Sequence, residues 1–208
     1  MSNQPKNQPK IILASQSPRR RELLSRMGIT HFDVLPAQGE EHIDHSLPAG
    51  LLVEALARQK AAEIAACAPP DAVIIAADTV VALDNEILGK PHTAQEAAEM
   101  LQKLSGRRHT VYTGVAVRQN DTELVEREAA QVHFRPLSPQ EIRAYIATGE
   151  PMDKAGAYGV QGYGCLFVEG IVGDYYNVMG LPVCRLGRML RQFGVDPLAL
   201  AAEQEAQA

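Results

Sequence analysis

A run of six consecutive apolar residues, Ala72 to Ala77, places the tightest limit on how this chain can fold. A helical pattern over 49–67 precedes the run and ends before Pro69-Pro70, and Asp78 follows it. A short, continuous apolar run of this kind is typical of a strand buried on both faces, as in sheets that pack between helices. We therefore expect an α/β protein in which 72–77 is a buried, mostly parallel strand with Asp78 at its carboxyl end.

The other patterns alternate between helix and strand, and several favour antiparallel pairs. A first helix is expected to start at Pro18, with Ser17 as its N-cap, and to end at Gly28. These patterns predict a mixed sheet in one two-lobed domain over 10–196, between flexible segments over 1–9 and 197–208. The expected strands are 10–14, 109–118, 122–134 and a hairpin of 165–168 with 171–178, and the later helices are 94–104, one opening at Ser138, and 182–193.

Composition excludes several functional classes. The 208 residues carry 20 basic and 25 acidic side chains, a net charge of −5, which gives no electrostatic footprint for polymeric nucleic acid. No apolar stretch is long enough to span a membrane and the first ten residues are polar, so we expect a cytoplasmic protein without a membrane partner. Cys67, Cys165 and Cys184 form no Cys-x-x-Cys pair, so we expect small buried apolar side chains rather than a disulfide or zinc site.

The start of the first helix breaks a local electrostatic rule. Arg19, Arg20 and Arg21 occupy its first turn, where the helix dipole and unpaired N–H groups disfavour cations. A bound anion would reverse that penalty, and the hydroxyls of Ser15 and Ser17 lie beside the same helix end. The pattern therefore indicates either a phosphate-binding turn or, equally well, a surface helix with solvated arginines.

Two charged residues interrupt apolar patterns further along the chain. Lys60 falls within the apolar stripe of the second helix, where it either needs a counter-charge or extends past the rim of the core. Asp78 ends a buried strand, where ligands bind in open α/β sheets. The alternative for Asp78 is a turn or capping carboxylate, although Thr79 and Val80 continue the β pattern.

An acidic loop is the candidate metal site. Glu40, Glu41 and Asp44 offer hard oxygen ligands, with His42 and His45 beside them. Such a cluster is more often only solvated, but if it binds a metal, Mg²⁺ or Mn²⁺ shared with phosphate oxygens is favoured over zinc. Lys90 and the glycine-rich stretch 159–164 match neither a P-loop nor a dinucleotide fingerprint, and no nucleophile has a clear histidine partner.

Five short motifs follow one another along the chain. They are Ser15-x-Ser17-Pro18-Arg19-Arg20, Ala77-Asp78-Thr79, Gly89-Lys90-Pro91, Leu104-Ser105-Gly106 and Asp153-Lys154-x-Gly156-x-Tyr158-Gly159-x-Gln161-Gly162. Taken together, they resemble the Maf family of nucleoside triphosphate pyrophosphatases, in the family's order from about Lys10 to Gly194. The resemblance implies a cytoplasmic, metal-dependent hydrolase that cuts between the α and β phosphates. It also implies an elongated α/β structure related to inosine triphosphate pyrophosphatases, with the nucleotide in a cleft between two lobes, and often a homodimer.

The same resemblance implies a role for each anomalous residue. Asp78 would accept the proton of the attacking water and, with Glu41, hold the divalent metal, Mg²⁺ or Mn²⁺. The remaining roles concern the substrate: Arg20, Lys60 and Lys90 would neutralise the triphosphate, and Ser15 and Ser17 would hydrogen-bond it.

Base preference is implied by three further positions. Arg19, Thr79 and Gln161 agree with the branch that acts on dTTP and UTP, whereas the 7-methyl-GTP branch typically has Trp, Gln and Glu there. Gln161 can both donate and accept, as a uracil or thymine edge requires. CTP and modified pyrimidine nucleotides stay open as substrates. The rival is a non-catalytic regulatory nucleotide-binding protein, because family members were first linked to septum formation and cell division.

Overall fold

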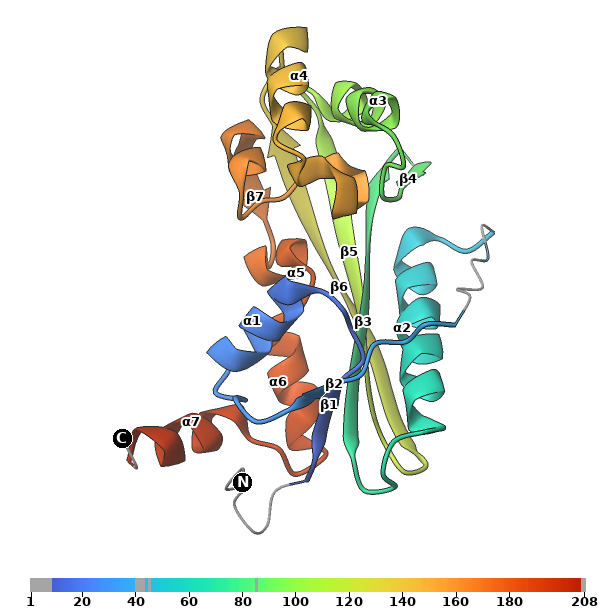
Figure 1. Ribbon diagram of the computed structural model, residues 1–208, viewed down its shortest axis with the longest axis vertical. Helices are drawn as coiled ribbons and strands as arrows, with labels where there is room; N and C mark the ends of the chain where they lie inside the picture. The colour runs from blue at the N-terminus through green and yellow to red at the C-terminus, as the bar shows by residue number, and fades with distance from the viewer. Residues whose placement is uncertain (1–8, 40–43, 45, 85, 207–208) are drawn as a thin grey trace.

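The computed structural model describes residues 9–39, 44, 46–84 and 86–206, and over these residues it is an elongated, mixed α/β structure (Figure 1). Its strands form one seven-stranded sheet of order β2-β1-β3-β5-β6-β7, with β4 also paired to β3. This confirms the predicted fold class, while the segment 1–8 that we expected to be flexible lies outside the described residues. The strands are β1 (Ile11–Leu13), β2 (Asp33–Val34), β3 (Val73–Leu83), β4 (Glu86–Leu88), β5 (Arg108–Gln119), β6 (Thr122–Phe134) and β7 (Val168–Val172).

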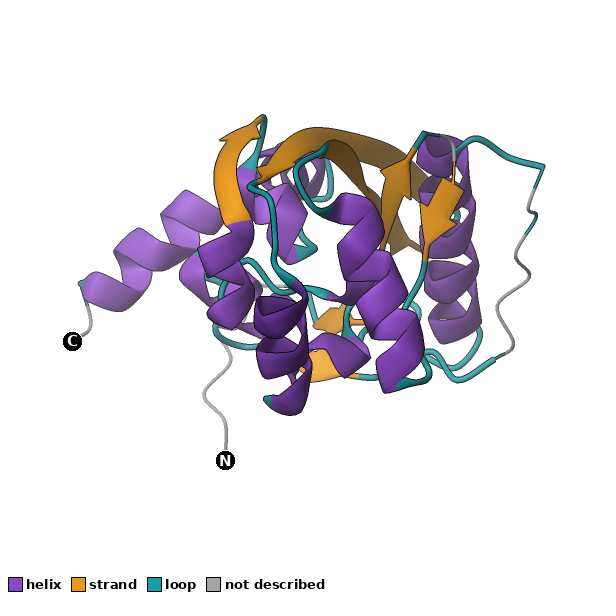
Figure 2. Cartoon of the chain, turned by 90° about the horizontal axis from the view of Figure 1, so that it is seen from above, coloured by secondary structure: helices purple, strands orange, loops and turns teal. Residues whose placement is uncertain are grey.

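Helices cover both faces of the sheet. The second helix packs on one face and the first, fifth and sixth on the other, while the third and fourth pack at the end of the long strands near β4 (Figures 1 and 2). None of the helices in the described ranges has the length and apolar character needed to cross a membrane. The α-helices are α1 (Pro18–Arg26), α2 (Ala49–Ala65), α3 (Ala94–Leu104), α4 (Pro139–Ala147), α5 (Tyr175–Met179), α6 (Val183–Arg191) and α7 (Pro197–Glu205), and the 3₁₀ turns are η1 (Glu150–Asp153), η2 (Ala155–Ala157) and η3 (Tyr163–Phe167).

Strand β3 is longer than its apolar run suggested. It is parallel to β1 but antiparallel to β4 and β5, and β5 pairs with it from Ile74 to Ala82. The expectation that Asp78 ends the strand is therefore wrong, because the ladder with β5 continues to Ala82 and the strand itself to Leu83. On its other side, β3 pairs with β1 only at 73–75 and with β4 only at 81–83. On that side, residues 76–80 have no strand neighbour among the described residues, and Asp78 lies at the centre of this gap.

A glycine opposite Asp78 lets α2 approach the sheet closely. Gly114 pairs with Asp78 across the β3–β5 ladder. A Cβ at Gly114 would lie 2.2 Å from the backbone oxygen of Val53, so only glycine fits beneath this part of the helix. The apolar stripe of α2 packs against β3 and β5 with Ala57, Ala61 and Ile64 in the core, which places this helix over the face of the sheet that carries Asp78.

The C-terminal segment 197–208, which we expected to be a flexible tail, forms helix α7 from Pro197 to Glu205. Helix α7 begins after Asp196, whose side chain accepts a hydrogen bond from Leu198 N at 3.0 Å, and its alanine-rich sequence has high helix propensity. Gln204 Nε2 donates to the oxygen of Gly28 at 2.9 Å, so the helix is also tied to the body of the protein. Compositional bias alone did not reveal that contact.

Two further expectations are wrong. The predicted strand over 171–178 is instead the end of β7 followed by α5, because Asp174 caps that helix and the fully buried Asn177 donates to the oxygen of Val111. The cysteines at 67, 165 and 184 are exposed, not buried. They lie after α2, in η3 and on the outward side of α6, and apolar character alone did not distinguish those positions from the core.

Candidate active site

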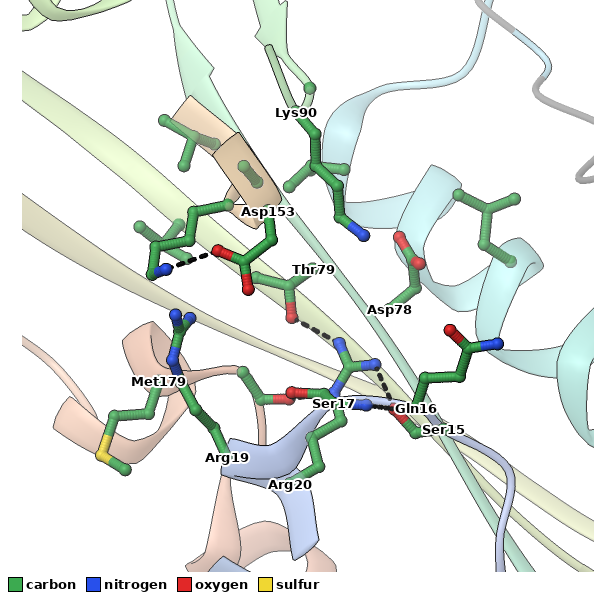
Figure 3. A pocket seen from close by; sticks show the side chains of 18 of the residues that line it. Ser15, Gln16, Ser17, Arg19, Arg20, Asp78, Thr79, Lys90, Asp153 and Met179 are labelled. Atoms are coloured by element: carbon green, nitrogen blue, oxygen red, sulfur yellow. Dashed lines mark hydrogen bonds and ion pairs between the residues drawn. The ribbon is translucent and has the colours of Figure 1, made fainter. Parts of the chain in front are cut away.

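The gap in the sheet beside β3 opens into a cleft of about 920 Å³. It is bounded by the β1–α1 turn, by β3, by α2, by the segment after β4 and by the irregular segment 153–158 (Figure 3). The described site residues that the sequence predicted, with one exception, all line this cleft: Ser15, Ser17, Arg19, Arg20, Lys60, Asp78, Thr79 and Lys90.

The β1–α1 turn is tied to the sheet by Arg20. Its guanidinium donates from Nε to the oxygen of Gly180 at 2.8 Å, from Nη1 to Ser15 Oγ at 3.1 Å and from Nη2 to Thr79 Oγ1 at 3.0 Å. Gly180 has φ +107° where it ends α5, a conformation that favours glycine. Arg20 therefore joins the turn, β3 and the end of α5 at one point, and its charge borders the cleft.

The N-terminus of α1 has the properties of an anion site. Ser17 is its N-cap but its side chain makes no capping hydrogen bond, and the first turn contains no acidic residue. Ser17 N instead donates to Ser15 Oγ at 3.2 Å. The helix end that faces the cleft thus combines backbone N–H groups, serine hydroxyls and the positive charges of Arg19 and Arg20. Arg21 is exposed and does not line the cleft.

Lys60 and Asp78 form an ion pair through Nζ and Oδ1. Their side chains are only 16% and 13% exposed, so the pair is largely withdrawn from solvent. The hypothesis that Lys60 needs a counter-charge is confirmed, and the counter-charge is the carboxylate at the gap in the sheet. Lys90, which follows β4, extends its amine toward the same carboxylate (Figure 3). Two lysines from different elements therefore surround one buried acid.

Thr79 lies on the neighbouring position of β3 and belongs to a hydrogen-bond chain. Thr113 Oγ1 donates to the oxygen of Asn177 at 3.0 Å, so Thr79 Oγ1, 2.9 Å away, donates to Thr113 and accepts from Arg20. The Thr79 hydroxyl therefore holds the Arg20 guanidinium in the cleft. The contribution of Thr79 to the site is to fix the position of this cation.

Sequence reasoning assigned no role to two charged residues on the opposite side of the cleft. Lys154 Nζ donates to the oxygen of Glu150 at 2.6 Å and pairs with Asp153, and both residues border the cleft, with Asp153 near Arg19 (Figure 3). Burial opposes ionisation of Asp153, but the hydrogen bond and charge of Lys154, with the charge of Arg19, hold its pKa below the usual value. The Asp-Lys-x-Gly motif was the available signal.

Gln161 is the exception among the predicted residues. It is exposed, in the glycine-rich loop after the 153–158 segment, and it does not line the cleft. Glu41 lies outside the described residues, together with Glu40, His42 and His45. Asp44 is described and exposed, and its Oδ1 accepts from the backbone and hydroxyl of Ser46 at 2.9 and 2.6 Å.

Among the described residues that line the cleft near Lys60 and Lys90, Asp78 is the one carboxylate that could bind a metal ion. No cluster of three or more His, Cys, Asp or Glu side chains suited to a metal occurs among the described residues. This donor set does not suit zinc, but it fits Mg²⁺ or Mn²⁺, which need only one or two carboxylates when substrate phosphates complete the shell.

Comparison with known proteins gives consistent relatives. A family model described as "Maf: Maf-like protein" matches residues 10–193. The dTTP/UTP pyrophosphatase of Moorella thermoacetica is 52% identical over 189 residues, covering 90% of this chain and 96% of that protein. Proteins of the same name from Bacillus velezensis and Symbiobacterium thermophilum are 48% and 50% identical over 186 and 184 residues, covering 89% and 88% of this chain and 97% and 94% of theirs.

Solved structures give weaker similarity. A HAM1 protein from Coxiella burnetii has a TM-score of 0.44 at 17% identity, over 61% of this chain and 73% of that chain. A nucleoside-triphosphatase / dITP/XTP pyrophosphatase from Mycobacterium abscessus has a TM-score of 0.40 at 16% identity, over 67% and 95%. The assignment rests instead on the family model and on relatives about half identical over nearly the whole length, and by both measures the chain belongs to the Maf family.

Proposed function

We propose that this protein is a nucleoside triphosphate pyrophosphatase that converts dTTP and UTP to the monophosphate and pyrophosphate, with residues 10–196 as its catalytic domain. The observation that carries the proposal is the largely buried Lys60–Asp78 pair beside an uncapped helix N-terminus in one cleft. The relatives named dTTP/UTP pyrophosphatase support the same activity. A protein that only binds other partners would not need a buried acid surrounded by cations.

The phosphate chain is expected to bind along the cationic side of the cleft. The N–H groups at the start of α1 and the hydroxyls of Ser15 and Ser17 supply donors. Arg20 is already fixed by three hydrogen bonds, so its charge requires little reorganisation when an anion binds. Lys60 and Lys90 supply the remaining positive charge on the side of Asp78.

The chemical step is hydrolysis at the α phosphorus. Asp78 accepts a proton from a water molecule, whose oxygen forms a bond to the α phosphorus. The bond from that phosphorus to the bridging oxygen breaks, and the electron pair leaves with pyrophosphate. Lys60 and Lys90 lie where the charge of the transition state and leaving group can be neutralised, which is the main demand of phosphoryl transfer.

A divalent cation suits this arrangement. Asp78 would hold it together with Glu41, as the family resemblance implies, and the ion would neutralise phosphate charge when bound. The two carboxylate oxygens of Asp78 would allow it both to hold the ion and to accept the proton of the water. Lys60 balances the same carboxylate when nucleotide is absent.

Base preference is assigned to the residues at positions 19, 79 and 161. Arg19 and Thr79 border the cleft, whereas Gln161 does not. A pyrimidine preference therefore requires the loop that carries Gln161 to approach the bound base. Substituting Trp, Gln and Glu at 19, 79 and 161 together should shift kcat/KM from dTTP toward 7-methyl-GTP.

The test is product analysis with the purified full chain. dTTP, UTP, CTP and 7-methyl-GTP are supplied with Mg²⁺ or Mn²⁺, and pyrophosphate and orthophosphate are measured separately. Pyrophosphate and monophosphate in equal amounts, fastest from dTTP or UTP, are expected. Orthophosphate as the primary product would contradict cleavage at the α phosphorus, and tight nucleotide binding without turnover would favour a regulatory protein.

A further inference from the structure

One side of the cleft is formed by short 3₁₀ turns rather than by a strand or an α-helix. We call residues 153–158 the wall: Asp153, Lys154 and Tyr158 border the cleft within it. The wall is built from the end of η1 and from η2, and it includes Gly156 at φ +68° and the buried Ala157 at φ +59°. Such a segment lacks the ladder of backbone bonds that holds a strand, so other contacts must fix its position.

Within the wall, Gly156 N donates to the oxygen of Gly89 at 3.0 Å and Tyr158 OH shares a hydrogen bond with His109 Nε2 at 2.8 Å. Two side chains outside the wall fix its two ends. Glu150 Oε1 accepts from Tyr145 OH at 2.9 Å and from Gly164 N at 3.1 Å, and its Oε2 accepts from Tyr163 N at 2.8 Å. Tyr145 OH in turn accepts from Gly159 N at 3.1 Å. We call Glu150 and Tyr145 the clasp. Because Glu150 precedes the wall and Gly159 follows it, the clasp closes the wall into a loop.

The glycines beyond the wall make room for the clasp. A Cβ at Gly162 would lie 2.2 Å from Oε2 of Glu150, and a Cβ at Gly164 would lie 2.7 Å from the backbone oxygen of Gly159 and 2.9 Å from Tyr145 OH. Any side chain at these positions would displace the carboxylate or the phenol. The glycine-rich stretch is therefore explained by the fit of two side chains rather than by a phosphate bound to its backbone.

Charge and packing also hold the clasp in place. Burial opposes ionisation of Glu150, but hydrogen bonds from Tyr163, Gly164 and Tyr145 and the charge of Lys154 hold its pKa below the usual value. The Tyr145 ring packs edge-on against Phe167, with centroids 4.9 Å apart. The backbone oxygen of Glu150 accepts from Lys154 Nζ, so the clasp is connected directly to a cation of the wall.

The wall faces the part of the cleft away from Asp78. Asp153 extends toward Arg19 and Thr79, whereas Lys90 extends toward Asp78 (Figure 3). A carboxylate repels phosphate but accepts hydrogen bonds from sugar hydroxyls and from base N–H groups. The chemistry of Asp153 therefore suits the nucleoside half of a nucleotide whose phosphates lie beside the lysines.

We propose that Glu150, together with Tyr145, is a positioning residue for substrate recognition: it holds the wall where Asp153 and Lys154 meet the nucleoside half of the substrate. Neither clasp residue is among the described residues that line the cleft, so the effect acts through the wall. The inference rests on the proposed nucleotide pyrophosphatase activity. It adds that nucleoside binding and the chemical step are controlled from opposite sides of the cleft.

Glu150→Gln tests this inference, because the amide NH₂ cannot accept the N–H donors that meet the carboxylate. We expect KM for dTTP to rise about tenfold with kcat within about twofold. Competitive inhibition by dTMP should weaken by the same factor, while inhibition by pyrophosphate, which has no nucleoside, should not change. An unchanged KM, or equal weakening of dTMP and pyrophosphate, would overturn the inference.

Two further variants separate positioning from folding. Tyr145→Phe keeps the ring packing and removes only the hydroxyl, so it should give the same pattern with a smaller change. Glu169→Gln on β7, whose carboxylate pairs with His133, should leave both inhibition constants unchanged. If the wild type releases no pyrophosphate from dTTP, the proposed activity fails, and calorimetric titration with dTMP and pyrophosphate then decides the role of the clasp independently.

Discussion

The two sides of the cleft are built in different ways. On the phosphate side, Lys60 and Asp78 project from a helix and a strand whose backbones are held by continuous hydrogen-bond ladders, and Arg20 from a third such element. The wall is irregular and is held by isolated contacts, which are the hydrogen bond from Gly156 N to the oxygen of Gly89 and the side-chain hydrogen bonds of Glu150 and Tyr145 at its ends. The positions of Lys60, Asp78 and Arg20 should therefore depend little on any single contact, whereas the position of the wall should depend on the clasp. The chemical step and nucleoside recognition should then be impaired by different mutations.

Asp78→Asn should have the largest effect. The amide is nearly isosteric but cannot accept a proton from water, so kcat should fall about 100-fold or more with KM for dTTP changed little. Steady-state kinetics and a thermal melt of the same preparation are the measurements. An unchanged kcat would mean that Asp78 has only a structural role and would contradict the proposal that the two sides of the cleft have different functions.

Lys60→Met should have the next largest effect. Met keeps the apolar stem and removes the charge, so kcat/KM should fall about tenfold or more while the melting temperature changes little. Lys103→Met is the matched control, since Lys103 pairs with Glu86 on the surface with about half of each side chain exposed, and it should alter neither quantity. Full activity with lost stability would show that the Lys60–Asp78 pair only supports the fold.

Gly162→Ala tests the wall side of the cleft. The added methyl would meet the Glu150 carboxylate, so KM for dTTP should rise about fivefold with little change in kcat. Gly170→Ala is the control, because a Cβ at Gly170 has nothing within 4 Å. A fall in kcat at unchanged KM would mean that the wall takes part in the chemical step.

The smallest effect concerns the core beneath the wall. His109 Nε2 shares a hydrogen bond with Tyr158 OH at 2.8 Å, and burial lowers its pKa from 6.5 to about 4. Between these pH values the unfolded chain binds a proton that the folded chain excludes, so stability contributed by His109 is complete above pH 6.5 and is lost as the pH falls toward 4.

His109→Gln should remove that dependence and leave activity at pH 8 unchanged. The slope of unfolding free energy against pH, measured by urea denaturation from pH 4.5 to 6.5, should decrease by at most about 1.4 kcal/mol per pH unit. An identical slope in both proteins would show that His109 titrates normally in the folded state.

The phosphate side was predictable from sequence because its signals are local. Arginines in a first helical turn, a lysine within an apolar stripe and an acid beside an apolar run each violate a short-range rule, and the cleft brings them together. The position of Asp78 within β3 was not predictable, because it depends on pairing with β5, more than 30 residues later. The antiparallel strands β5 and β6 were predicted nearly to their ends from their alternating residues.

The wall was not predictable for the opposite reason. Its form depends on contacts from Glu150 to backbone groups 13 and 14 residues later, which no periodicity encodes. Helices α5 and α7 were missed for similar reasons, since one is fixed by the buried Asn177 and the other by Gln204 and Gly28. In such irregular segments, the sequence motifs identified residues that matter but did not indicate what those residues contact.

Hydrolysis in ¹⁸O-labelled water tests the central claim most directly. If Asp78 directs water to the α phosphorus, a single turnover of dTTP by the wild type places the label in dTMP and leaves pyrophosphate unlabelled. Glu150→Gln should give the same distribution at saturating dTTP, because the wall affects binding and not the site of attack. Label in pyrophosphate would mean attack at the β phosphorus and would contradict the account of the phosphate side.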